Sequence, residues 1–318
     1  MKNKIFLVLG WLISLIFLYF ALHGLSWSLV IASFAKVSFL TPILMIGTYC
    51  LGFVIRALRW KFLLPHGIPI ADSLGAVVLG YAANNILPAR LGELVRAQAI
   101  GRKCEISRSL ALASIFVERI FDGLVMTGLL YLGIRGQDIP NWALSVGVLG
   151  LSIFGGALCL VLILAFTRSL WEAKIKAFPS SKLNNILGQF AKGFTLIGRN
   201  AQLPFTILGL TILVWLVECI MFYIAIQSFD IKVPTTAPLF VMGLINLGIL
   251  VPAAPGYLGA FQYFGVLALS PWQVNSADAL ASVILIHACQ YLPITLWGAF
   301  YLRYFGFSSI EKLRIAVK

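Results

Sequence analysis

The sequence predicts an all-α polytopic membrane protein with about six full transmembrane helices and two re-entrant helical hairpins, arranged as inverted repeats. An apolar composition, long uncharged runs and two broken apolar segments support this prediction. Hydrophobic residues make up 60% and charged residues 11% of the 318 residues, whereas soluble chains are about half apolar and about a quarter charged. We expect a single transmembrane domain over 1–318, with a first repeat half at 1–135 and an inverted second half at 136–318.

The uncharged runs are long enough to cross a bilayer, which takes about 20 helical residues. We predict spans at 5–22, 39–58, 109–134, 142–167, 204–228 and 278–302. The first run follows Lys2 and Lys4, as a secretory signal would. However, it is longer than the roughly 7–15 apolar residues of a signal and lacks a small-residue cleavage site. We therefore expect it to be retained as the first helix.

Two further apolar segments are interrupted and predict the hairpins. Ser73–Leu87 is too short to span comfortably, ends at Pro88 and lies between two basic clusters, so both of its flanks should face the same side. Pro238–Ser270 is uncharged but contains breaks at Pro252 and Gly256. Two full spans in place of each hairpin would give the same sidedness.

The positions of lysine and arginine predict the orientation. With the N-terminus inside, 20 of the 24 Lys and Arg residues fall on the cytoplasmic side, with Arg56, Arg59 and Lys61 marking that face and 168–203 forming a cytoplasmic loop. Cytoplasmic loops collect positive charge, so the net charge of +13 reflects topology, and we expect no nucleic-acid partner. We expect a bacterial inner (plasma) membrane protein with both termini in the cytoplasm.

Weak internal similarities predict a duplication. Three patterns recur in order at offsets of 168, 170 and 164 residues: Ala111–Ser114 with Ala279–Ser282, Gly128–Leu132 with Gly298–Leu302, and Pro88–Gly92 with Pro252–Gly256. Each unit holds three crossings and one hairpin, so the copies have opposite orientations. Inverted repeats with broken helices are typical of secondary transporters. Hairpins that only pack a channel or an assembly scaffold are the alternative.

The span 109–134 carries Glu118, Arg119 and Asp122. Ionisable groups inside a bilayer cost about 2.5–3.5 kcal/mol each, so they are expected to face a partner or a wet cavity. Arg119 and Asp122 are three residues apart and can pair. In the functional interpretation, Arg119 binds an anionic headgroup, Asp122 stays ionised, and Glu118, left without a partner, carries a proton. The structural interpretation is an internally neutralised cluster.

The second half supplies polar residues to the same predicted cavity. Glu218 lies within the span 204–228 and has no cation close by in the sequence. By the repeat offset, His287 and Gln290 correspond to Arg119 and Asp122. We expect Glu218, His287 and Gln290 to line the cavity or take part in proton coupling. A single buried histidine is also compatible with a structural role.

The arm after the first hairpin break carries Arg90, Glu93 and Arg96 at a spacing of three along a new helix. Arginine suits phosphate because its planar fork can bind two oxygens at once, and a helix N-terminus attracts anions. These residues are therefore predicted to bind substrate. An interfacial amphipathic helix with snorkelling arginines would give the same pattern.

At these residues the chain resembles the lysylphosphatidylglycerol synthase transmembrane, or flippase-like, family. The resemblance rests on four motifs: Arg56-Ala57-Leu58-Arg59-Trp60, Asn85-x-x-Pro88-x-Arg90-x-Gly92-Glu93-x-x-Arg96, Glu118-Arg119-x-x-Asp122 and Pro255-Gly256-Tyr257-Leu258-Gly259. It implies that Arg56 and Asn85 join the substrate-binding residues. In bifunctional relatives a soluble aminoacyl-transfer domain follows, and the membrane part is credited with translocating the modified lipid.

Two departures from the family pattern limit what the resemblance implies. No aminoacyl-transfer domain precedes Lys318, so we expect no synthase activity from these residues. Gln262 stands where a family glutamate is expected, which argues against a carboxylate role in the second hairpin.

The function predicted is that of a lipid flippase or transporter for an anionic or zwitterionic headgroup, working by alternating access. The alternatives are a membrane-embedded transferase using Glu118, Asp122 or His287 as acid or base, and an accessory protein of envelope-lipid synthesis. The sequence contains no H-E-x-x-H, G-x-S-x-G or P-loop motif, and its five cysteines form no CxxC pair. We expect no cofactor and no metal. The expected partners are a membrane lipid substrate and, in addition, a second copy in a homo-oligomer or a lipid-synthesis protein.

Overall fold

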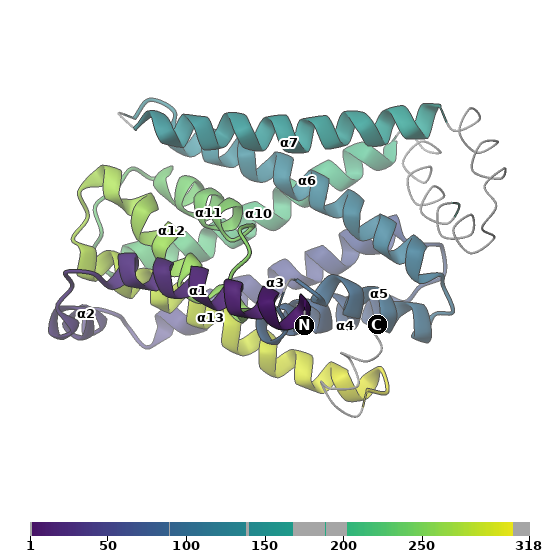
Figure 1. The fold of residues 1–318 in the computed structure, drawn as a ribbon, viewed down its shortest axis with the longest axis horizontal. Helices are drawn as coiled ribbons and strands as arrows, with labels where there is room; N and C mark the ends of the chain where they lie inside the picture. The colour runs from purple at the N-terminus through teal and green to yellow at the C-terminus, as the bar shows by residue number, and fades with distance from the viewer. Residues whose placement is uncertain (1, 89, 138–139, 168–187, 189–201, 308–318) are drawn as a thin grey trace.

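The computed structural model describes residues 2–88, 90–137, 140–167, 188 and 202–307, and every regular element in them is a helix (Figure 1). Each of the six predicted spans is a long helix. They are α1 (Lys2–Leu22), α3 (Leu40–Leu63), α6 (Arg108–Ile134), α7 (Asn141–Phe166), α10 (Gln202–Ser228) and α13 (Ser276–Tyr304). The predicted loop 168–203 lies almost entirely outside the described residues.

Hydropathy and length identify the membrane-crossing elements. Four helices (α3, α7, α10 and α13) are long and apolar enough to span a bilayer, and α1 gives a fifth when it is taken with α2 (Trp27–Phe34), an unpredicted short helix bent by 80° from it. Helix α6 is equally long but carries Glu118, Arg119 and Asp122. The all-α polytopic membrane fold is thereby confirmed.

The outward faces of these helices are apolar. On α7, which lies along the top edge of Figure 1 beside α6, Val148, Leu149 and Leu151 are each well over half exposed. Large exposed apolar faces are unfavourable in water but match hydrocarbon, and a helix satisfies its own backbone hydrogen bonds there.

Each predicted hairpin consists of two short helices that pack on each other. The first is α4 (Ile70–Ile86) with α5 (Gly92–Lys103), and the second is α11 (Ala237–Gly248) with α12 (Ala260–Leu269). A Cβ on Gly92 would lie 2.0 Å from the Gly80 carbonyl oxygen, so glycine is required where α4 and α5 meet. The break in the second hairpin holds the 3₁₀ turn η1 (Pro255–Tyr257), and η2 (Ser270–Trp272) follows α12.

The two halves of the chain interlock. Helices α3 and α10 pack against each other, α4 packs against α13, and α11 packs against α6. Glycines allow the close approaches: a Cβ on Gly298 of α13 would meet Ala82 of α4 at 2.1 Å, and one on Gly133 of α6 would meet the Phe240 backbone of α11 at 2.5 Å. Each hairpin therefore packs on a long helix of the other half.

Three arginines counted as cytoplasmic surface charges lie in the core instead. Arg56, Arg59 and Arg96 are at most 2% exposed. The surface interpretation is wrong for them, and so is the snorkelling alternative for Arg96, because carboxylates inside the bundle neutralise all three. Most of the remaining Lys and Arg residues still fall on the predicted cytoplasmic side.

Candidate functional site

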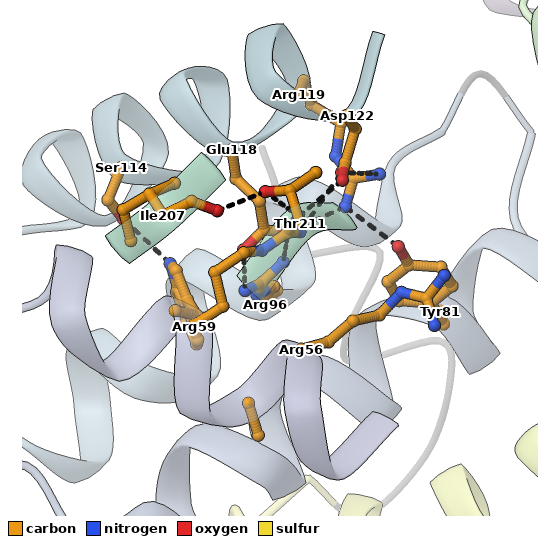
Figure 2. A network of polar contacts seen from close by, with 12 residues as sticks. Arg56, Arg59, Tyr81, Arg96, Ser114, Glu118, Arg119, Asp122, Ile207 and Thr211 are labelled. Carbon is orange, nitrogen blue, oxygen red and sulfur yellow. Dashed lines mark hydrogen bonds and ion pairs between the residues drawn. The ribbon is translucent and has the colours of Figure 1, made fainter. Parts of the chain in front are cut away.

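The deepest part of the site is Glu118, which is fully buried on α6 and contacts three arginines (Figure 2). Arg96 of α5 binds both carboxylate oxygens, with Nη1–Oε1 2.8 Å and Nη2–Oε2 2.9 Å. Arg59 of α3 and Arg119 approach Oε1 to 3.2 and 3.0 Å. A buried carboxylate is stable only where its charge is compensated and its lone pairs are bonded. The expectation that Glu118 lacks a cation is wrong, which makes it poorly suited to carry a proton.

Asp122, one turn further along α6, is joined to Glu118 through Arg59. Arg59 Nη1 lies 2.6 Å from Oδ1 of Asp122 and Nη2 lies 3.2 Å from Oδ2. Trp215 Nε1 donates to Oδ1 at 3.0 Å. Arg119 Nη1 lies 3.4 Å from Oδ2, so the predicted Arg119–Asp122 pair is confirmed. The two carboxylates thus share one helix face and two arginines, Arg59 and Arg119.

Arg59 is absent from the residues predicted for the site, although the family motif contains it. It lies on the buried face of α3 with Arg56, Trp60 and Leu63, a spacing of three, four and seven that marks one side of a helix. Its Nη1 also donates to Thr211 Oγ1 on α10 at 2.9 Å. That helical periodicity was the sequence signal that would have identified Arg59.

A second ion pair joins the two halves. Arg56 Nη2 of α3 binds Glu218 Oε2 of α10, and both side chains are buried. Gln290 Nε2 of α13 donates to the other oxygen, Oε1, at 2.9 Å. The Arg56 guanidinium lies 5.0 Å from the centroid of the Trp215 ring, within reach of a cation–π contact. Glu218, which has no cation near it in the sequence, therefore has one in the fold.

Eight of the eleven predicted site residues line one small cavity of about 90 Å³, which we call the polar cavity. They are Arg56, Asn85, Arg90, Glu93, Arg119, Glu218, His287 and Gln290. Both halves of the chain contribute to this lining, as the repeat offset predicts for His287 and Gln290. Tyr81, Trp215, Asn246 and Tyr257 also line it and were not predicted.

A larger cavity of about 370 Å³, the apolar cavity, continues from the polar one. The two share Arg90, Glu93, Arg119, Trp215 and Asn246, and Asp122 also lines the apolar cavity. The rest of the lining is mainly aliphatic and aromatic: Leu112, Ile115, Phe116, Met126, Phe154, Leu247 and Leu250. Phe116 and Leu250 are each 45% exposed, so the apolar cavity reaches the outer surface of the bundle.

Arg90 and Glu93 stand at the junction of the two cavities. Arg90 lies before α5, not on it, with a positive φ of 55°, so the prediction of three charges along one helix is wrong. Its guanidinium lies 5.5 Å from the Tyr257 ring centroid and has no carboxylate partner in the described part of the chain. Glu93, in the first turn of α5, likewise has no ion pair among the described residues. Both charges remain available to a ligand.

Asn85 reaches the polar cavity but is committed to α13. Its Nδ2 donates to the Tyr291 carbonyl at 3.2 Å and to Thr295 Oγ1 at 2.9 Å. Tyr291 Oη donates back to the Asn85 carbonyl at 3.2 Å. These bonds fix the end of α4 against the other half.

His287 is held by hydrogen bonds on both ring nitrogens. Nε2 donates to the Gly256 carbonyl at 2.9 Å, and Gln262 Nε2 donates to Nδ1 at 2.9 Å, while Gln262 Oε1 accepts from the Gly259 amide. The ring stacks on Phe261 at 4.3 Å. This pattern requires a neutral imidazole. Gln262, the departure from the family pattern, thus braces the break of the second hairpin.

The charges of the site do not cancel. Five arginines line the cavities or belong to the ion-pair network that reaches them: Arg56, Arg59, Arg90, Arg96 and Arg119. Four carboxylates oppose them: Glu93, Glu118, Asp122 and Glu218. One positive charge is left over in a low-dielectric interior, where it attracts an anion strongly.

Membrane-length apolar helices around an interior charged cavity define a polytopic integral membrane protein. A family model described as the lysylphosphatidylglycerol synthase TM region matches residues 7–298, and the chain belongs to this family. The resemblance drawn from the four motifs is therefore confirmed.

The relatives are membrane proteins and one larger enzyme. A UPF0104 membrane protein of Methanocaldococcus jannaschii is 29% identical over 220 residues, 68% of this chain and 91% of the relative. Another, of Methanothermobacter thermautotrophicus, is 27% identical over 264 residues, 74% of this chain and 76% of the relative. The glycosyltransferase AglD of Haloferax volcanii is 25% identical over 255 residues, 68% of this chain but 40% of that protein.

Proposed function

We propose that the protein moves a lipid with an anionic or zwitterionic headgroup between the leaflets by alternating access. The observation that carries this proposal is the continuity of the polar cavity with the apolar one through Arg90, Glu93 and Arg119. A lipid has the same division into a charged end and a hydrocarbon end. Ionisable residues inside a membrane bundle usually mark such a substrate path.

The proposed headgroup contacts are the side chains with unused bonding capacity. Arg90 and Arg119 face both cavities, and an arginine fork can hold two phosphate oxygens. Glu93 stands beside them and suits the cationic group of a zwitterionic headgroup. The leftover positive charge of the site favours a phosphate-bearing lipid over a neutral one.

We also propose that the two halves are inverted repeats, which alternating access would use. Equivalent helices of the two halves have equivalent packing partners. The contact of α4 with α13 corresponds to that of α11 with α6, and the contact of α5 with α6 corresponds to that of α12 with α13. Helices α3 and α10, which start at Leu40 and Gln202, are equivalent in this scheme and pack against each other. The hairpins are re-entrant in this scheme, and both termini are cytoplasmic in the plasma membrane.

A membrane-embedded transferase is the weaker candidate. Its predicted acids and bases were Glu118, Asp122 and His287, and each is held by ion pairs or by hydrogen bonds. A group engaged in this way is poorly placed to exchange protons with a substrate.

Reconstituted liposomes test the proposal. Headgroup-labelled phosphatidylglycerol, phosphatidylcholine and a neutral diacylglycerol analogue would be followed by an external quencher, with protein-free liposomes as the control. We expect phosphatidylglycerol to cross intact, and the protein to accelerate its crossing over the protein-free rate more than it accelerates that of the neutral analogue, which crosses readily without help because it has no charge. Chemical conversion of the lipid would support the transferase. Crossing rates equal to those of protein-free liposomes would refute transport.

A further inference from the structure

Arg56 is the buried arginine with the most unused bonding capacity in the described part of the chain. Only its Nη2 is engaged, by Glu218, whereas Nη1 and Nε have no hydrogen-bond partner there. Arg59 and Arg96 use both terminal nitrogens and leave only Nε unpaired. A guanidinium carries five N–H donors, and leaving them unbonded in a buried site is costly.

The Arg56 side chain lies beside the polar cavity. Arg56 is 1% exposed and lines that cavity together with Glu218. The rings of Phe53, Tyr81 and Trp215 surround the guanidinium at 5.4, 5.6 and 5.0 Å from their centroids, so it is positioned without a second carboxylate. An anion in the polar cavity would meet a pre-positioned arginine.

Glu218 is the paired carboxylate of the site with the fewest cations. Glu118 contacts three arginines and Asp122 contacts two, but Glu218 contacts Arg56 alone. Its second oxygen accepts a hydrogen bond from Gln290 of α13. If Arg56 turned to another anion, Glu218 would keep this bond.

We propose that the Arg56–Glu218 pair is an exchange site, in which the phosphate of an anionic headgroup binds Arg56 by displacing Glu218 onto Gln290. This inference rests on the proposed function and names the anionic phosphate as the group recognised. A neutral headgroup brings no charge to replace that of Glu218, so the Arg56–Glu218 ion pair stays intact. Helices α3 and α10 pack against each other across the two halves, so the exchange also breaks the ion pair between these two helices.

Binding of phosphatidylglycerol with a fluorescent acyl chain to protein in phosphatidylcholine nanodiscs tests this proposal. Glu218→Gln removes the competing carboxylate and should raise the affinity about tenfold, which is about 1.4 kcal/mol. The gain should vanish in an Arg56→Gln background. If the gain persists there, Glu218 acts only through its long-range field and the exchange is refuted. Unchanged or weaker binding by Glu218→Gln also refutes it.

Two further variants keep the test decisive if Arg56→Gln does not fold. Gln290→Leu removes the bond that holds the displaced Glu218, so affinity should fall about threefold, or about 0.7 kcal/mol; unchanged affinity refutes the exchange. Asp278→Asn is the matched control, since it removes the carboxylate of an ion pair with Lys36 away from both cavities and should leave binding unchanged. Failure of the wild type to bind any labelled lipid would instead overturn the proposed function.

Discussion

Arg96 and Glu118 form a two-pronged ion pair in which neither side chain is more than 2% exposed. The Arg96 guanidinium also lies 3.7 Å from the centroid of the Trp60 ring. The pair ties α5 to α6, and neither residue lines the polar or the apolar cavity. Arg96 therefore has a structural role, holding α5 against α6, whereas Arg90 lines both cavities.

Breaking this pair should destabilise the protein. Removing one partner of a buried ion pair typically costs about 3–5 kcal/mol, because the other charge is left uncompensated. We expect Arg96→Ala and Glu118→Gln to lower the unfolding temperature in detergent substantially, and Arg96→Lys to do so less. Lys36→Gln breaks an exposed pair and should change stability by about 1 kcal/mol or less. Normal stability of both core variants would contradict the supporting role.

Arg90 should show the opposite behaviour. Its side chain faces both cavities without a carboxylate partner in the described residues, so its loss leaves no buried charge unpaired. We expect Arg90→Ala to reduce lipid transport at least about tenfold, as expected for a lost charged contact, with little change in unfolding temperature. Arg90→Lys should be intermediate because it keeps the charge but loses the fork. Arg102→Ala, an exposed arginine on α5, is the control, and equal transport by all three variants would remove Arg90 from the site.

Gly128 and Gly298, which the proposed repeat makes equivalent, should respond differently to substitution by alanine. A Cβ on Gly298 would lie 2.1 Å from the Ala82 Cβ, whereas one on Gly128 would have no neighbour within 4 Å. Gly298→Ala should therefore cost about 1–3 kcal/mol by overpacking α13 against α4. Gly128→Ala should be neutral or stabilising by about 0.5–1 kcal/mol, since alanine favours a helix more than glycine. Thermal unfolding of the two variants side by side gives the answer.

Labelling from each side of the membrane tests the orientation. On a cysteine-free background, Ser38→Cys, in the exposed α2–α3 connection, should react from outside, and His66→Cys, in the exposed α3–α4 connection, from the cytoplasm. Cysteines at Asp138 and Ser180, which lie outside the described residues, should likewise react from outside and inside. The reverse labelling at any of these positions would overturn the inverted-repeat scheme.

The spans and breaks of the fold were predictable because they depend on local sequence. Apolar length located the six long helices to within a few residues, and Pro88 and Pro252 located the hairpin breaks. The site was predictable in composition but not in pairing. Arg56 and Glu218 are 162 positions apart, and Arg59 and Asp122 are 63 apart, so only the packing of α3 against α6 and α10 brings them together. Counting arginines as surface charges failed for the same reason.

The long sequence separation of Arg56 from Glu218 constrains biogenesis. When α3 has been synthesised, the chain contains no carboxylate that could neutralise Arg56 and Arg59, because residues 1–63 include no Asp or Glu. Each unneutralised arginine inside a bilayer costs about 2.5–3.5 kcal/mol. Arg59 gains its partner Asp122 when α6 is synthesised, whereas Arg56 gains its partner Glu218 only when α10 is synthesised. We therefore expect α3 to reach its final place in the bundle only after α6 and α10 have been made.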